Sequence, residues 1–116
     1  MSTKDCIFCK IVSGELPSET LYQDEHCVAF NDLSPQAPVH ILLVPCVHIE
    51  SLDKAGEGDR SVLGHLLLKA AEIARSRGIA DDGYRVVINT NSDGGQTVFH
   101  LHVHLLGGRP FVFPPG

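Results

Sequence analysis

Three histidines near the carboxyl end of the chain alternate with apolar residues, and their spacing suits chemistry. Residues 100–106 read HLHVHLL. Side chains two positions apart share one face of a β-strand, so the pattern predicts one surface lined by His100, His102 and His104, backed by apolar residues in the core. Structure alone has no need of three imidazoles in a row. The segment therefore indicates a functional site.

Two chemistries could use such a row of imidazoles. One is a metal site, because imidazole nitrogens ligate zinc. The other is nucleophilic and acid–base chemistry near neutral pH, which suits the ordinary histidine pKa of about 6.5. Residues 92–97 read SDGGQT and come directly before the row, and a glycine-rich loop can offer backbone N–H groups to a phosphate. This neighbour favours phosphorus chemistry.

A second motif lies near the start of the chain, where Cys6 and Cys9 form a CxxC pair. Such a pair is half of a zinc site, or a redox pair, although no thioredoxin-like βαβ pattern follows it. Cys27 and Cys46 are interpreted as buried or incidental thiols. His26 and His65 are interpreted as structural.

The elements that position these residues fit one domain over residues 1–116. A short helical turn is predicted at 6–12. A long helix is predicted at 59–77, where apolar residues recur at helical spacing, and Gly78 is its expected end. Strands are predicted at 19–23, 26–31, 39–44, 84–89 and 98–106, with a loop at 91–95. This order predicts an α+β domain, an antiparallel sheet with a helix packed on it.

Composition excludes several classes of function. The chain of 116 residues has 9 basic and 14 acidic side chains and a net charge of −5, which argues against a nucleic-acid or anionic-membrane partner. It has no apolar run near the roughly 20 residues of a spanning helix and no visible signal peptide. A cytoplasmic protein is expected.

The histidine pattern resembles the signature of the histidine triad (HIT) superfamily of nucleotide hydrolases and transferases. Further segments are similar to the histidine triad nucleotide-binding (Hint) branch, from Ile7 to the last residue: 30–38, His40, 92–96, 106–109 and 114–116. The resemblance implies a five-stranded antiparallel sheet with one long and one short helix. It also implies a homodimer in which two such sheets form one ten-stranded sheet.

The resemblance also implies an activity, that of a purine nucleoside phosphoramidase acting on adenosine 5′-monophosphoramidate-type nucleotidyl amines. His102 would be the nucleophile and form a nucleotidyl-histidine. His104 would bond a phosphate oxygen and help to protonate the leaving amine, with His40 supporting this proton network. Thr97 stands where relatives carry a serine that bonds the departing nitrogen, and Asn89 would orient the site.

The remaining nucleotide contacts follow from the same resemblance. The backbone at Gly95 and Gln96 would cradle the α-phosphate, and the Asp32 carboxylate would take the ribose hydroxyls. The purine would be walled by Ile7, Phe8, Phe30 and Leu33. Asn31 stands where some relatives have a histidine, so the contact made by that histidine is not carried over to this chain.

Zinc is the one metal implied, and catalysis needs no cofactor. Superfamily members with cysteines at this place resemble zinc proteins, which here would give a structural site of Cys6, Cys9, His48 and His100. The alternative is that both cysteines are plain thiols.

Two other functions stay open beside the phosphoramidase. One is a dinucleoside polyphosphate hydrolase, although the SDGGQ loop and the PPG ending argue against it. The other is a nucleotide-sensing or protein-binding module with incidental hydrolysis.

Overall fold

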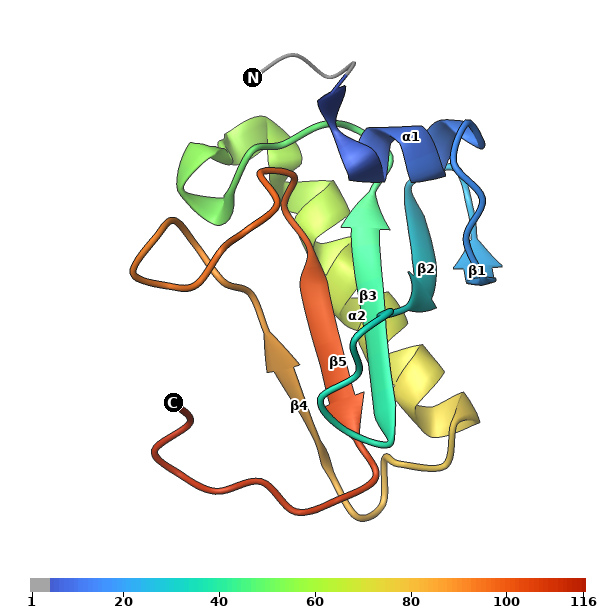
Figure 1. The fold of residues 1–116 in the computed structure, drawn as a ribbon, viewed down its shortest axis with the longest axis vertical. Coiled ribbons are helices and arrows are strands. Elements are labelled where there is room, and N and C mark those ends of the chain that lie inside the picture. Colours follow the sequence, from blue (N-terminus) through green and yellow to red (C-terminus); the bar gives the residue numbers. More distant parts are fainter. Residues whose placement is uncertain (1–4) are drawn as a thin grey trace.

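The computed structural model describes residues 5–116, which form one antiparallel sheet of five strands with a long and a short helix (Figure 1). The strands lie side by side in the order β1-β2-β3-β5-β4. Their bounds are β1 Thr20–Gln23, β2 Cys27–Asn31, β3 Val39–Pro45, β4 Tyr84–Val87 and β5 Val103–Gly107. Strands that follow one another in the chain are neighbours in the sheet, except β3 and β4, which are separated by β5.

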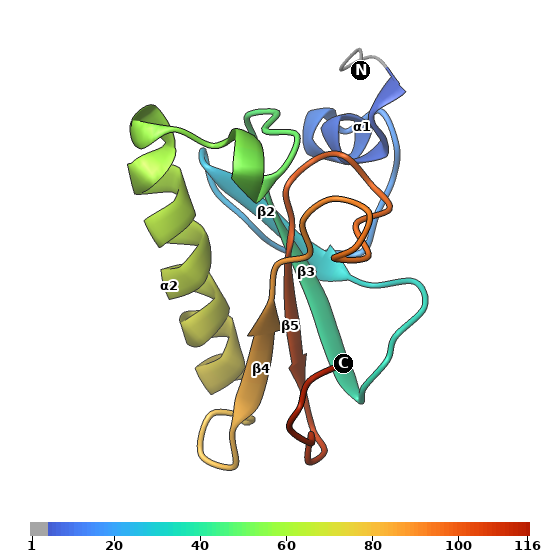
Figure 2. The ribbon, with the colours of Figure 1, turned by 90° about the vertical axis from the view of Figure 1, so that its left-hand side faces the viewer.

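The long helix α2, Arg60–Ser76, covers one face of the sheet (Figure 2). Its buried residues meet alternate residues of the strands in the main core. This core contains Ala29, Ile41, Leu43, Leu66, Ala70, Ile73, Leu101, Val103 and Leu105. Burial of apolar surface at about 25 cal/mol per Å² makes this layer the main source of stability.

The short helix α1, Ile7–Ser13, lies on the opposite face, near one end of the sheet (Figure 2). Here Phe8 packs with the residues of β2 and β3 that point away from α2, namely Val28, Phe30, Leu42 and Val44. Alternate side chains of each strand thus pack into two different layers. Any polar side chain in phase with Phe30 and Leu42 emerges on the α1 face.

The predicted architecture is confirmed, with one substantial difference at the last strand. Pairing of β5 with β3 begins at Val103, not at Val98, and β4 ends at Val87, not at Asn89. Pro45 at the end of β3 has no N–H, and its carbonyl accepts a hydrogen bond from the imidazole of His100 instead. The N–H of Leu101 bonds the carbonyl of Ile49, so residues 98–102 lie outside the sheet, with bends at 98–100.

Gly78 ends α2 as predicted, with φ of 74°, a left-handed conformation that glycine adopts without strain. Two short 3-10 turns, Leu52–Lys54 and Glu57–Asp59, precede the helix. Within residues 5–116, no helix has the length and apolar character needed to span a membrane.

Candidate active site

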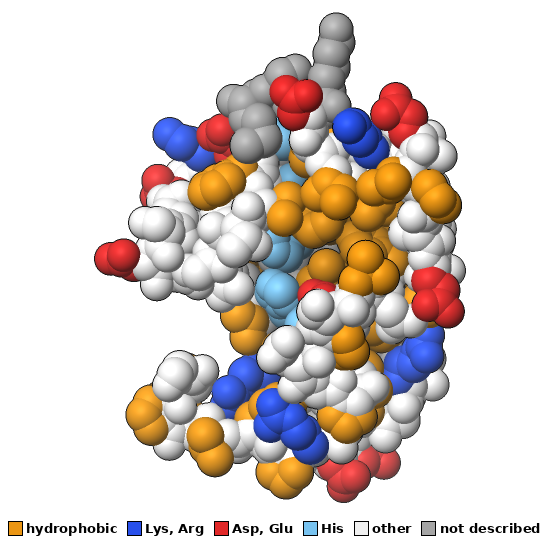
Figure 3. Space-filling view, viewed as in Figure 1, with side chains coloured by type: hydrophobic (Ala, Val, Ile, Leu, Met, Phe, Trp, Pro, Cys, Tyr) orange, Lys and Arg blue, Asp and Glu red, His pale blue; other side chains and the backbone are white. Residues whose placement is uncertain are grey.

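The histidines of the row lie on the α1 face, where Figure 3 shows a line of imidazoles along the wall of a hollow. Leu101, Val103 and Leu105 point the other way, into the core under α2. The alternation predicted from the sequence therefore holds, although His100 and His102 precede β5. His100 is fully buried, and His102 is 7% exposed.

His102 is held in one tautomer by the backbone. Its Nδ1 lies 2.8 Å from the carbonyl oxygen of His100, and because a carbonyl only accepts, Nδ1 carries the proton. The lone pair is then on Nε2, as a nucleophile needs. Burial lowers the pKa of His102, opposed by the carbonyl bond and by Asp32, so the ring stays neutral at pH 7. Phe8 meets the ring edge to face, with 5.1 Å between centroids.

His104 forms a pair with His40. β3 and β5 place the two side chains on the same face, and Nε2 of His40 lies 2.9 Å from Nδ1 of His104. Burial lowers the pKa of His104 to about 4, helped by the neighbouring His102 and His40. The Nε2 of His104 is buried and has no partner among residues 5–116, so the ring has a free nitrogen to offer to a ligand.

Asp32 lies beside this pair at the end of β2. Its Oδ2 is 3.4 Å from Nε2 of His40, and its Oδ1 accepts the backbone N–H of Ser34 at 2.8 Å. The Asp32 side chain is 20% exposed. One carboxylate oxygen can therefore still accept hydrogen bonds from a ligand's hydroxyls.

The predicted purine wall divides into two parts. Phe8 and Phe30 are buried and pack edge to face, with centroids 5.7 Å apart. Ile7 is 45% exposed and Leu33 is 98% exposed. The two phenylalanines form part of the smaller core as well as an apolar surface beside His102.

The glycine-rich loop is a compact turn whose own carbonyls take the predicted donors. Gly95 N–H bonds the carbonyl of Ser92, and Gln96 N–H bonds that of Asn91, both at 3.0 Å. In this conformation neither amide is free for a phosphate. Gly94 is required here, because a Cβ at this position would lie 2.4 Å from the carbonyl oxygen of Thr90.

The loop is anchored by the buried side chain of Gln96. Its amide donates to the carbonyls of Glu50 and Val98, and its oxygen accepts the N–H of Asn91. Thr97, the next residue, is exposed, and Asn89 is half-buried at the start of the connection from β4. Sequence analysis named Gln96 for its backbone and missed this anchoring role of its side chain.

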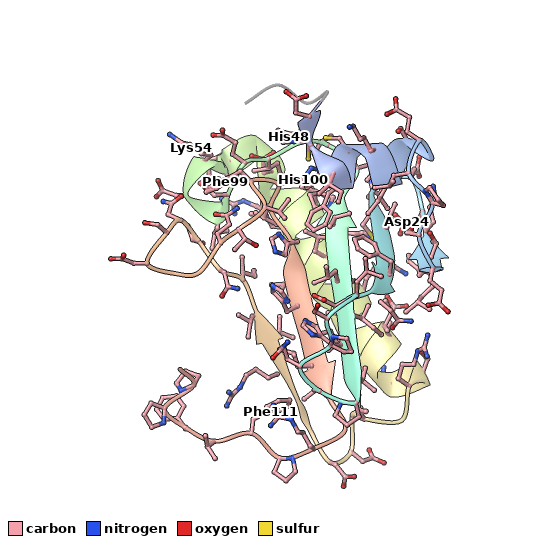
Figure 4. The ribbon with its side chains drawn as sticks, in the orientation of Figure 1. Asp24, His48, Lys54, Phe99, His100 and Phe111 are labelled. Carbon is pink, nitrogen blue, oxygen red and sulfur yellow. The ribbon has the colours of Figure 1, made fainter. Side chains whose placement is uncertain are left out.

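The first histidine of the row belongs to a second cluster, with Cys6, Cys9 and His48 (Figure 4). Nδ1 of His100 lies 3.3 Å from Cys6 Sγ, 3.5 Å from Cys9 Sγ and 3.2 Å from Nδ1 of His48, which is 3.3 Å from Cys9 Sγ. Ligands at about 2.0–2.3 Å from a tetrahedral zinc would be roughly 3.3–3.8 Å apart. The four predicted residues do come together.

The donor set of this cluster suits a cation. His100 directs its Nε2–H to the carbonyl of Pro45 at 2.9 Å, so its Nδ1 lone pair faces the thiols and His48. Burial raises the pKa of Cys9 to about 11, with further rises from Cys6. Electron-rich atoms thus converge without a positive charge between them. These residues could hold a metal ion through two sulfurs and two nitrogens.

Comparison with known proteins places the fold and the site in one family. The HIT domain matches residues 13–111, and the chain belongs to this family. A purine nucleoside phosphoramidase of Escherichia coli K12 is 49% identical over 107 residues, which cover 92% of this chain and 90% of that protein. An uncharacterized HIT-like protein of Synechocystis is 53% identical over 113 residues, covering 97% and 98%. These relatives are consistent with the Hint branch.

Solved structures agree with this assignment. A HIT family hydrolase from Legionella pneumophila superposes with a TM-score of 0.95 at 44% identity, covering 97% of this chain and 100% of that one. A zinc-bound histidine triad family protein from Mycobacterium smegmatis superposes with a TM-score of 0.77 at 30% identity, covering 93% and 78%.

Proposed function

We propose that this protein is a purine nucleotide-binding hydrolase that cleaves the P–N bond of adenosine 5′-monophosphoramidate-type nucleotidyl amines. The observation that carries the proposal is the bond from His102 Nδ1 to the carbonyl of His100, which leaves Nε2 as a neutral nucleophile. The name of the Escherichia coli relative supports the same reaction class.

The reaction has two displacements at phosphorus. In the first, the Nε2 lone pair of His102 bonds the α-phosphorus, and the P–N bond to the amine breaks with its electron pair going to nitrogen. The amine takes a proton and leaves. In the second, water bonds the phosphorus, the P–Nε2 bond breaks and a proton is released, giving the nucleoside monophosphate. Splitting one hard displacement into two easier ones is the advantage of covalent catalysis.

The other residues assist these steps. His104 faces the same side as His102, with ring centroids 5.0 Å apart, and its ring N–H hydrogen-bonds a phosphate oxygen and helps the departing amine, whose proton comes from solvent water. Thr97 bonds the leaving nitrogen, and Asn89, Gly95 and Gln96 contact the phosphate after a small opening of the loop.

The nucleoside lies over the phenylalanines of the α1 face. Phe8 and Phe30 contact the purine together with the exposed Ile7 and Leu33, and Asp32 accepts hydrogen bonds from the ribose hydroxyls. The whole of residues 1–116 would then serve as a single HIT domain.

The test compares two substrates and two variants. Steady-state hydrolysis of an adenosine phosphoramidate is measured beside that of a diadenosine polyphosphate, for the wild type, His102→Ala and His26→Ala. His26 is an exposed histidine beside Glu25 and serves as the matched control.

We expect preferential P–N hydrolysis, lost by about three orders of magnitude or more in His102→Ala with nucleotide affinity retained. His26→Ala should match the wild type. A His102→Ala protein that keeps a tenth of the wild-type rate would refute the nucleophile. Faster hydrolysis of the diadenosine compound would favour the polyphosphate hydrolase, and binding without turnover would favour a nucleotide-sensing module.

We further infer a structural zinc ion held by Cys6, Cys9, His48 and His100. Zinc bound there would supply a cross-link with a closed shell of four protein ligands and no position for substrate. His102 and His104 are not in the ligand set and stay available for chemistry.

A homodimer is also inferred, with β4 as the edge strand that meets its twin. β4 lies at one end of the sheet, and apolar residues near it are partly or largely exposed: Tyr84 36%, Val86 38%, Leu67 48%, Leu68 69%, Val112 78% and Phe113 87%. Such a surface is expected to be covered in a soluble protein. A monomeric mass in light scattering at micromolar concentration would exclude the dimer. A cytoplasmic location, and the expectation of no nucleic-acid or membrane partner, stay predictions from the composition.

A further inference from the structure

The protonation of the His40 ring is fixed by a backbone amide from the proline-rich turn. The N–H of Gln36 lies 3.0 Å from Nδ1 of His40. Because an N–H can only donate, Nδ1 must carry its lone pair there. The proton of the neutral ring is then on Nε2.

This tautomer determines that of the neighbouring ring. The Nε2–H of His40 donates to Nδ1 of His104 at 2.9 Å, so Nδ1 of His104 is an acceptor and its proton is on Nε2. That nitrogen is the buried one without a partner. His104 therefore holds a buried N–H donor without an acceptor, which a phosphate oxygen or a departing nitrogen could accept as a hydrogen bond.

The opposite arrangement would remove this donor. If Nδ1 of His40 carried the proton and Nε2 the lone pair, Nδ1 of His104 would have to donate and Nε2 would be bare. A doubly protonated His40 is the other competitor, because Asp32 Oδ2 lies 3.4 Å from Nε2. The Gln36 amide opposes both states, since each needs a proton on Nδ1.

Gln36 is in turn held by Arg109, from the segment that follows β5. Nη2 of Arg109 donates to the Gln36 carbonyl at 3.0 Å, and its guanidinium lies 4.4 Å from the ring centroid of Phe111. Gly108 permits the approach, because a Cβ there would lie 2.8 Å from Cβ of Pro38. The carboxyl-terminal segment and the turn are thus joined beside His40.

We propose that Arg109 is a positioning residue, which acts through the backbone of Gln36 to set the tautomers of the His40–His104 pair. The inference deepens the proposed function, because the donor it creates on His104 would serve the leaving amine. The groups that face His40 are His104 from β5 and Asp32 from the loop after β2, and Arg109 reaches it only through Gln36.

Nitrogen-15 spectra of the imidazoles test the proposal directly, because they report which ring nitrogen bears a proton. In the wild type above pH 7, we expect Nε2–H and a bare Nδ1 for both His40 and His104. In Arg109→Gln, both rings should show a mixture of tautomers instead of this single one. The pH at which Nδ1 of His40 takes up a proton should rise. It should also slow P–N hydrolysis by about tenfold, as the loss of one hydrogen bond implies. Arg109→Lys, which keeps a donor, should be intermediate.

Two further variants separate positioning from general damage. A backbone ester at Gln36, made with the α-hydroxy analogue of glutamine, removes only the N–H and should change the His40 spectrum more than Arg109→Gln. Arg60→Gln, which removes an exposed arginine paired with Glu57, is the control and should change neither spectrum nor rate.

The proposal is overturned if the wild type shows Nδ1–H on His40, or if Arg109→Gln leaves the spectrum as it was, whatever the ester does. If the spectra show the predicted tautomers but the protein does not hydrolyse phosphoramidates, the positioning role is supported and the proposed function is refuted. The two failures are thereby distinguishable.

Discussion

Removing the Cys/His cluster tests how the amino-terminal segment is fixed to the catalytic one. The double variant Cys6→Ser/Cys9→Ser replaces both thiols by hydroxyls, which are poor zinc ligands. The cluster joins three segments, since Cys9 and His48 are 39 residues apart and His48 and His100 are 52 apart. Loss of the metal therefore frees two long loops of chain.

The size of the effect follows from loop closure. A cross-link across about 40 residues restricts the unfolded chain by roughly 4 kcal/mol in the chain-entropy treatment. That figure is an upper bound for a metal cross-link, because part of the ligand set can bind metal in the unfolded chain. We expect a loss of about 2–4 kcal/mol, which for a domain of this size lowers Tm by roughly 10 °C.

The assay combines metal analysis with thermal unfolding of protein purified without chelator. The wild type should contain nearly one zinc per chain, and the double variant should lose both the zinc and the stability while keeping part of its activity. Cys46→Ser is the matched control, because this half-buried thiol lies outside the cluster. Metal-free wild-type protein with the Tm of the double variant would refute the zinc site and leave the phosphoramidase proposal standing.

Three further predictions concern groups on other parts of the molecule. The folded pKa of His104, about 4, lies below the ordinary value of about 6.5, so its contribution to stability is complete above pH 6.5 and is lost as the pH falls toward 4. His104→Asn should weaken the pH dependence of the free energy of unfolding in that window, and an unchanged slope would contradict the low pKa. Asp24 accepts four hydrogen bonds, from Tyr22 Oη, His65 Nε2 and two backbone N–H groups at 2.7–2.9 Å. Asp24→Ala should therefore cost about 2–4 kcal/mol in urea unfolding, more than His65→Ala, which removes only one donor; equal costs would show that the carboxylate does not organise the turn. Deleting 111–116 removes the Phe111 ring that packs on Arg109, and Arg109 lies on the His40–His104 side of the site. The deletion should therefore change the ratio of kcat/KM between two leaving amines more than the affinity for the nucleotide, and a loss of affinity alone would contradict this reasoning.

The sheet and the long helix could be predicted because their signals are local. The apolar run at 39–44 predicts a buried strand and the helical spacing at 59–77 predicts a helix, and the structure confirms both. The start of β5 could not be predicted from such a signal. Its late onset depends on Pro45, far away in sequence, whose carbonyl accepts from His100.

The site was predictable where side chains carry the chemistry and unpredictable where the backbone does. The spacing of the histidines predicted that they share one face, and the family resemblance predicted that the four residues of the Cys/His cluster come together. The bonds that set the tautomers come from the carbonyl of His100 and the N–H of Gln36. Every residue except proline carries both groups, so no residue type marks them in a sequence.

The division of one extended segment between two layers has a consequence for how this protein can vary. Leu101, Val103 and Leu105 fill the core, while His102 and His104 lie side by side on the opposite face, with His102 against Phe8. Substitutions on one side leave the other side in place, so packing and specificity can drift independently over generations. An insertion or deletion of one residue within 100–105 would exchange the two sides at once. Lineages of this protein should therefore change the two sides separately and tolerate no change in length here.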